Sequence, residues 1–181
     1  GWSKKDSLKE WRKRVGEEEA NKISRKASNR GTKLHKACEK FLLNEHEYLK
    51  EVDIFTLDLF NTIKPILSER IDNIHGIETA LYSDYLGIAG RCDCIAEYNG
   101  TISIVDFKSS GKLKRREWIE DYFMQCACYA VMFEERTGIP VTQLVVIIAV
   151  EDEQPQVFVE KRSDWIQLAR LTIKEYQEAH S

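Results

Sequence analysis

The sequence predicts an α/β domain in which helices flank a central mixed β-sheet. Apolar residues recur at helical spacing up to about residue 66, and from Gly76 their period changes to two. The aliphatic run 144–150 follows a second helical segment and is typical of a fully buried strand. Strands that alternate with helices around one such run indicate a mixed sheet with a helical layer on each face. A chain of 181 residues is expected to form one domain, residues 1–181.

The N-terminal part predicts two helices. Ser7 and Glu10 match a capping box, so the first helix is expected from about residue 8 to residue 26. The sequence Ser-Asn-Arg-Gly at 28–31 is expected to end it, and apolar spacing indicates a second helix over 32–43. We therefore expect a helical arm over residues 1–30 and a core over residues 31–181.

The middle of the chain predicts a helix followed by strands. Apolar residues at helical spacing over 52–66 indicate the helix, which Pro65 is expected to kink or end. Ile77, Thr79 and Leu81 then alternate with Glu78, Ala80 and Tyr82, which indicates a strand.

The C-terminal part predicts a long helix, two strands and a closing helix. The long helix is expected over 116–136, and the strands over 144–150 and near 156–161. The closing helix is expected to be capped by Ser163.

Asn99-Gly100 predicts a tight two-residue hairpin, because a type I′ turn needs positive φ at both positions. With this turn, Asp93 lies opposite Asp106 and Arg91 lies opposite Lys108, all on one face of the sheet. Opposed like charges need a counter-charge. The counter-charge is either a cross-strand ion network on the surface or a divalent cation, and the second strand, apolar on both faces, favours the cation.

Four ordered motifs then resemble one family. The motifs are Gly31-x3-His35, Gly90-Arg91-Cys92-Asp93, Asp106-Phe107-Lys108 and Gln125-x3-Tyr129. This set is similar to the motifs of the RecB-like branch of the PD-(D/E)xK nucleases. The resemblance implies a restriction-endonuclease-like core for this α/β domain, and so a single nuclease domain.

The resemblance also implies roles for matching residues. Asp93, Asp106, His35 and the backbone carbonyl of Phe107 would bind Mg²⁺ or Mn²⁺, as one or two ions. Lys108 would assist catalysis at the scissile phosphate. Gln125 and Tyr129, four apart on a helix, would orient Lys108 or contact the phosphate. Glu78 is either an additional metal ligand or a surface carboxylate.

The implied activity is metal-dependent hydrolysis of DNA by an exonuclease that prefers single strands with a free end and leaves 5′-phosphates. A structure-specific endonuclease and a non-catalytic DNA-binding module are the alternatives. Roles in replication, repair or recombination, with an oligomer or a protein partner, would fit. The branch's iron–sulfur cysteine pattern is not matched after Cys128, so no such cluster is expected.

Charge and cysteine usage fit this interpretation. Residues 1–33 hold eleven basic and five acidic side chains, whereas the remainder holds sixteen basic and twenty-five acidic ones. The basic side chains expected to contact DNA are Arg30, Arg91, Lys112, Lys114, Arg115 and Arg116. Five cysteines without a secretory signal predict reduced thiols, and zinc is disfavoured because Cys126 and Cys128 diverge on a helix. We expect a soluble intracellular protein without membrane contact, in a phage-infected cytoplasm or a mitochondrial matrix.

Overall fold

A five-stranded mixed sheet forms the centre of the molecule. The computed structural model describes residues 2–181, with side chains from Ser7 onward. The strand order is β1-β2-β3-β4-β5, in which β3 and β4 are parallel and all other neighbours are antiparallel. The predicted mixed sheet is therefore confirmed. The strands are β1 (Ile71–Ser83), β2 (Ile88–Tyr98), β3 (Thr101–Ser110), β4 (Gln143–Val150) and β5 (Gln156–Lys161).

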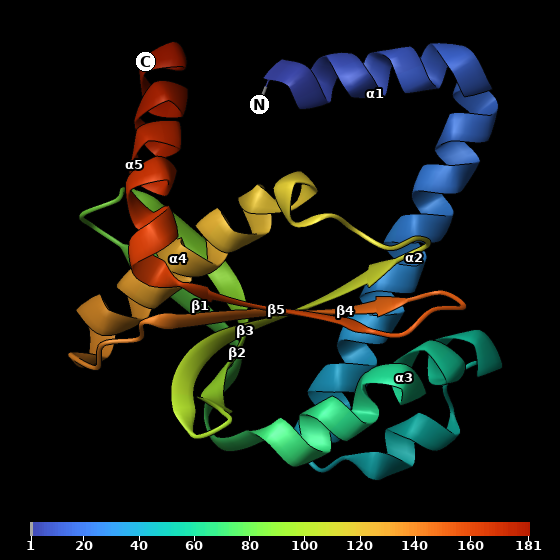
Figure 1. Cartoon of the computed structure of the whole chain (residues 1–181), viewed down its shortest axis with the longest axis horizontal. Coiled ribbons are helices and arrows are strands. Elements are labelled where there is room, and N and C mark those ends of the chain that lie inside the picture. Colours follow the sequence, from blue (N-terminus) through green and yellow to red (C-terminus); the bar gives the residue numbers. More distant parts are fainter. Residues whose placement is uncertain (1) are drawn as a thin grey trace.

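Helices cover both faces of the sheet (Figure 1). The longer helices are α1 (Trp2–Val15), α2 (Glu17–Leu42), α3 (Ile54–Arg70), α4 (Glu120–Thr137) and α5 (Arg162–Ala179), and the short ones are η1 (His46–Lys50) and η2 (Arg116–Trp118). Strand β4 shows the two layers most simply. Leu144, Val146 and Ile148 pack with α4 and α5, whereas Val145 and Ile147 pack with α2 and α3. Burial of β4 on both faces explains its continuous aliphatic run.

The predicted helix break at residues 28–31 is wrong. The break falls at Gly16, which adopts φ 87°, and α2 then continues without interruption through Gly31. Arg30 explains why the local propensity is overridden, because its guanidinium hydrogen-bonds Ser109 at 3.3 Å and Glu151 at 3.0 Å. The predicted boundary between the arm, residues 1–30, and the core, residues 31–181, thus falls inside α2. Gly1, the first residue of the predicted arm, lies outside the described residues.

Other expected helix ends also differ. The Ser7 cap is wrong, because α1 already begins at Trp2. Helix α3 continues past Pro65 to Arg70, and the segment from Arg116 forms η2 before α4 begins. Lys161 occupies the N-cap of α5, without a side-chain cap, so the predicted Ser163 cap is wrong too. Local sequence signals place the ends of helices less reliably than they place the helices themselves.

The β2–β3 hairpin opens into a fork at the candidate site. Tyr98 pairs with Thr101, which confirms the predicted turn, and pairing continues to Cys94 and Val105. Beyond that point β2 remains paired with β1 and β3 remains paired with β4, but β2 and β3 no longer form a ladder. We call the divergent residues, 88–93 of β2 and 106–110 of β3, the fork. Asp93 and Asp106 therefore do not form the expected ladder pair, although both lie where the strands separate.

Gly90 allows α4 to lie close against the fork. A Cβ atom at this position would lie 2.9 Å from Cε1 of Tyr129. We expect Gly90→Ala to lower the free energy of unfolding by about 1–3 kcal/mol, since the ring and the strand must move apart. Urea denaturation measures this loss. Gly111→Ala is the matched control, because its nearest neighbour would lie 3.5 Å away; equal stability of the two variants would contradict the prediction.

Candidate active site

Three secondary-structure elements bring an imidazole and two carboxylates together at the fork. His35 extends from α2, Glu78 from β1 and Asp93 from β2, and their ligand atoms lie within 4.8 Å of one another. His35 Nε2 lies 2.6 Å from Asp93 Oδ1 and 3.0 Å from Glu78 Oε1. The other oxygen of Asp93 accepts a hydrogen bond from the backbone amide of Phe107 at 2.9 Å. Asp93 thus links α2 to β3 across the fork.

Glu78 reaches this cluster through an unusual backbone conformation. Its φ is 50°, which is uncommon for a residue with a long side chain. In the β1–β2 ladder Ile77 pairs with Cys94 and Thr79 pairs with Cys92, so Glu78 lies between these pairs, beside Asp93. Strained residues of this kind concentrate at functional sites. The Glu78 carboxylate therefore lies in the cluster, and its role as an additional metal ligand stays a prediction.

Asp106 adds a third carboxylate, and this one is buried. Its exposed fraction is only 4%. Burial raises the pKa of Asp106 well above its ordinary value, and the charge of Asp93 raises it further. Burial would also raise the pKa of Asp93, but hydrogen bonds from His35, Asp106 and the Phe107 amide lower it. The pKa of Asp106 therefore lies above the ordinary carboxyl value, whereas that of Asp93 lies below it.

The donor set fits a hard divalent cation. Oε1 of Glu78 and Oδ2 of Asp106 are buried and accept no hydrogen bond, although Nε2 of His35 lies 3.0 Å from the first and Nζ of Lys108 lies 3.3 Å from the second. Two carboxylates approach Nε2 of His35, which can donate only one hydrogen, and Asp93 at 2.6 Å is the one that accepts it. Buried oxygens left without donors are costly unless a cation accompanies them. Carboxylate oxygens with one imidazole are ligands that Mg²⁺ and Mn²⁺ accept.

Lys108 lies beside this cluster. Its Nζ is 3.3 Å from Oδ2 of Asp106 and 4.6 Å from the centre of the Tyr122 ring. Burial lowers the pKa of Lys108, but the charges of Asp106 and Asp93 outweigh burial, so the pKa lies above its ordinary value. Lys108 is therefore an ammonium group at neutral pH, suited to stabilising negative charge rather than to removing a proton.

Tyr122 is a site residue that sequence reasoning missed. It lies three residues before Gln125 and seven before Tyr129 on α4, a spacing that places all three on one helical face. Gln125 is exposed, whereas Tyr129 is buried with its ring against Gly90. Burial first, and then nearby charges that include Asp106, raise the pKa of Tyr129. The expected roles of Gln125 and Tyr129 stay predictions, while Tyr122 is the tyrosine in contact with Lys108.

The basic residues expected to contact DNA have different surroundings. Arg30 is paired with Glu151, and Arg116 is paired with Glu160, so neither charge is uncompensated. Lys112 and Arg115 lie over the exposed ring of Trp118, at 5.5 and 5.3 Å from its centre.

The remaining two basic residues differ again. Lys114 bonds through its backbone to the Gln156 side chain, and Arg91 is exposed. The group Lys112, Arg115 and Trp118, here called the Trp118 platform, is the part of this basic segment that combines cations with an exposed aromatic ring.

The five cysteines are free and buried, as predicted. Burial raises the pKa of Cys94 to about 12 and that of Cys128 to about 11, which keeps both as thiols. The metal-ligand cluster found among the described residues, His35, Glu78 and Asp93, contains no cysteine. Among residues 2–181, no helix has both the length and the apolar character needed to cross a membrane.

Sequence comparisons relate the chain to nucleases. Residues 4–180 match the family model described as the PD-(D/E)XK nuclease superfamily. Human mitochondrial genome maintenance exonuclease 1 is 26% identical over 159 residues, which is 82% of this chain and 45% of the human protein. The Xenopus tropicalis protein of the same name is 25% identical over 157 residues, 82% of this chain and 44% of that protein. The chain thus spans less than half the length of these curated relatives.

A solved structure has a related fold. A crystal structure of a Eubacterium rectale protein, provisionally named an exonuclease, superimposes with a TM-score of 0.57 and 14% identity. The match covers 84% of this chain and 65% of the other. At this identity the likeness concerns the fold, a helix-flanked mixed sheet.

Proposed function

Because the chain belongs to the PD-(D/E)XK nuclease superfamily, whose members use divalent metal ions, we propose that it is a metal-dependent DNA exonuclease. The observation that carries the proposal is the cluster at the fork. There, three carboxylates, two of which have a buried oxygen that accepts no hydrogen bond, lie beside an imidazole and a protonated lysine. Buried carboxylate oxygens that accept no hydrogen bond favour a further cation beside the imidazole and the ammonium group.

The residues at and around the fork have different proposed roles. Asp93, Asp106 and His35 would hold one or two Mg²⁺ or Mn²⁺ ions, with Glu78 and the Phe107 carbonyl as further ligands. When bound, such an ion polarises a phosphoryl oxygen and lowers the pKa of a coordinated water. Lys108, kept protonated by Asp106, stabilises negative charge that develops on the phosphate. Tyr122 limits the positions open to Lys108 by packing its ring under the ammonium group.

The proposed substrate is single-stranded DNA with a free end, cut to leave 5′-phosphates. Support comes from the relatives, which are named exonucleases, and from the Trp118 platform, whose ring can stack on an unpaired base. Replication, repair and recombination intermediates that expose such ends are the settings that this activity fits.

Substitutions in the Trp118 platform test the substrate assignment. Trp118→Ala is expected to weaken binding of single-stranded DNA about 10-fold, because one base loses its stacking partner, without changing the salt dependence. Lys112→Ala is expected to weaken binding and to reduce the slope of log affinity against log salt by about 0.7. Fluorescence anisotropy at several salt concentrations in EDTA measures both. Equal salt slopes for the wild type and Lys112→Ala would contradict phosphate contact by Lys112.

End-labelled linear and closed circular single strands test the activity itself, each in Mg²⁺, in Mn²⁺ and in EDTA. We expect metal-dependent shortening of the linear strand with the circle left intact. Cleavage of the circle would identify an endonuclease instead. Salt-sensitive binding without cleavage in either metal would identify a non-catalytic DNA-binding module and overturn the proposal.

A further inference from the structure

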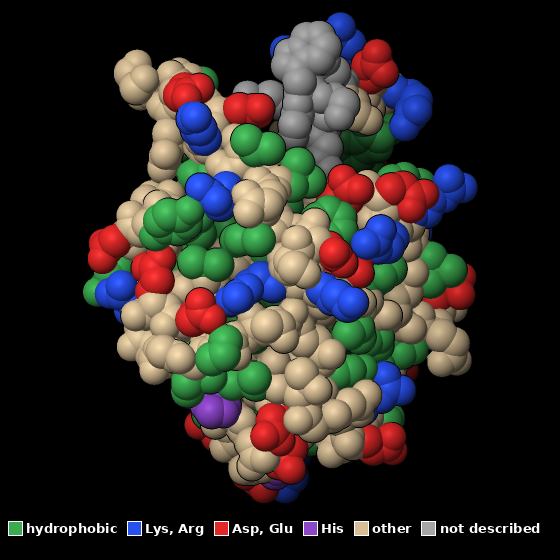
Figure 2. Space-filling model, turned by 60° about the vertical axis from the view of Figure 1, so that its left-hand side comes forward, with side chains coloured by type: hydrophobic (Ala, Val, Ile, Leu, Met, Phe, Trp, Pro, Cys, Tyr) green, Lys and Arg blue, Asp and Glu red, His purple; other side chains and the backbone are tan. Residues whose placement is uncertain are grey.

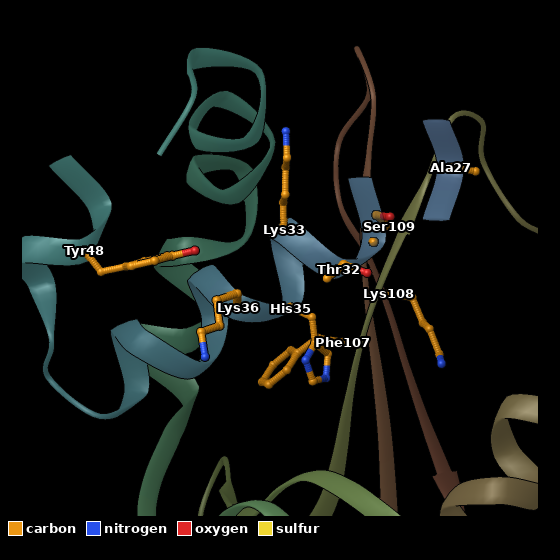
Figure 3. Close-up of a pocket in the computed structure, with 10 residues that line it drawn as sticks. Ala27, Thr32, Lys33, His35, Lys36, Tyr48, Phe107, Lys108 and Ser109 are labelled. Atoms are coloured by element: carbon orange, nitrogen blue, oxygen red, sulfur yellow. The ribbon is translucent and has the colours of Figure 1, made fainter. Parts of the chain in front are cut away.

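A cleft of about 570 Å³ extends from the fork along α2 towards η1. Its lining includes the candidate catalytic residues His35, Phe107 and Lys108. Tyr48 of η1 and Lys108 lie at opposite ends of the cleft in Figure 3, with His35 and Phe107 between them. The cleft is therefore continuous with the fork and reaches beyond it.

The charge of the cleft lining is of one sign. Lys33, Lys36 and Lys108 line it together with His35, and none of the residues that line it is Asp or Glu. The whole chain, by contrast, has a net charge of −3, and the face shown in Figure 2 mixes acidic and basic side chains. A cavity lined by cations and continuous with a phosphodiesterase centre is complementary to a phosphate backbone.

The two lysines beyond the fork are available to a ligand. Lys33 lies 3.4 Å from Asp53 and Lys36 lies 3.6 Å from Glu39, both at exposed or half-exposed positions. Surface ion pairs of this kind contribute little to stability. A phosphate can therefore compete for both ammonium groups.

The shape of the cleft suits one nucleotide. On α2, Ala27, Gly31 and His35 follow at intervals of four residues, so two small side chains leave the helix surface open beside the imidazole. Across from them, the Tyr48 side chain extends towards Thr32 and Lys33 (Figure 3). A pocket of a few hundred Å³ holds a small molecule rather than a duplex.

We propose that this cleft binds the nucleotide next to the scissile phosphate of the single strand. Tyr48 stacks on its base, and Lys33 and Lys36 contact the phosphate on that side. The inference rests on the proposed nuclease function, because the same strand must pass through the fork. It assigns to η1 and to the middle of α2 a part in substrate binding that lies outside the metal-binding residues and the Trp118 platform.

The test compares Tyr48→Ala, Tyr48→Phe and Lys36→Ala in the full chain, with Tyr85→Ala as the matched control. Tyr85 is an exposed tyrosine in the β1–β2 turn, outside the cleft. A short single-stranded oligonucleotide, labelled at one end, is titrated in EDTA and then used as substrate in Mn²⁺. Tyr48→Ala is expected to raise both Kd and KM about 10-fold with little change in kcat, whereas Tyr48→Phe and Tyr85→Ala resemble the wild type.

Lys36 provides an independent test of the cleft assignment. Its side chain is exposed, so its removal should not affect folding. Lys36→Ala is expected to reduce the salt slope of binding by about 0.7, and Lys36→Arg to restore it. Wild-type Kd, KM and salt slope in both Tyr48→Ala and Lys36→Ala, with cleavage intact, would overturn the cleft assignment and leave the nuclease proposal standing. If the wild-type protein cleaves no DNA but both variants bind the oligonucleotide more weakly than it does, the cleft assignment is retained and the nuclease proposal is overturned. A wild type that binds no oligonucleotide overturns both.

Discussion

Asp106→Asn is expected to abolish metal-dependent cleavage and to remove the stabilisation that Mn²⁺ gives the wild-type protein. Loss of an outer partner of a metal ligand already costs about 10–100-fold in affinity or activity, so loss of a carboxylate ligand should exceed about 100-fold. Thermal unfolding with and without Mn²⁺, beside the cleavage assay, measures both effects. Asp152→Asn, at an exposed loop position, is the matched control and should resemble the wild type.

The same substitution should not destabilise the metal-free protein at neutral pH. The folded-state pKa of Asp106 is raised, mainly by burial, so ionisation of this carboxyl opposes folding. The contribution of the protonated Asp106 carboxyl to stability is therefore fully present below the ordinary carboxyl pKa. It is lost as pH rises through the raised pKa of the folded state. In EDTA we expect Asp106→Asn to equal or exceed the wild type in unfolding free energy at pH 7, with a smaller difference at pH 4. Marked destabilisation of this variant at pH 7 in EDTA would contradict the buried-carboxyl assignment.

Lys108→Ala is expected to lower kcat by about 100- to 1000-fold, the usual cost of removing one preorganised group that stabilises charge in the transition state. Mn²⁺ should still stabilise the variant, because Lys108 lies beside the carboxylates without being a ligand. This combination separates a catalytic role from a structural one. Single-turnover cleavage and thermal unfolding in Mn²⁺ provide the two measurements.

Lys161→Ala is the control for this prediction, because Lys161 is also a lysine at a strand end but lies at the exposed end of β5. Its kcat should be that of the wild type. A Lys108→Ala variant with wild-type kcat would show that the ammonium group serves only to balance Asp106.

Much of the sheet could be predicted because its signals are local. Asn99 and Gly100 both adopt positive φ, which only a few residue types tolerate, and this fixed the hairpin register from residues 98 and 101 to 94 and 105. The continuous aliphatic run identified the buried strand β4. The end of the first helix could not be predicted in the same way. Arg30 holds α2 against Ser109 and Glu151, which lie 79 and 121 positions further along the chain.

The candidate site could be predicted only in part from the sequence, because its contacts join segments that lie far apart in the chain. The hairpin brought Asp93 and Asp106 into one neighbourhood, but the fork, which ends their pairing, depends on how β1 and β4 hold the two strands apart. Glu78 enters the cluster through a positive φ that its residue type does not suggest. The contact between Tyr122 and Lys108 requires α4 to be docked on the sheet, so no local pattern reveals it. Arg116 lies beside Glu160, a partner that counting charges along the sequence cannot identify.

The most direct test of the proposed metal centre is an anomalous-scattering map from crystals of this protein soaked in Mn²⁺. We expect a manganese peak at the fork, with ligands from Asp93, Asp106 and His35, and loss of that peak in Asp106→Asn. A peak elsewhere, or an empty fork in crystals of protein that cleaves DNA in Mn²⁺, would contradict the assignment of these residues as the metal ligands.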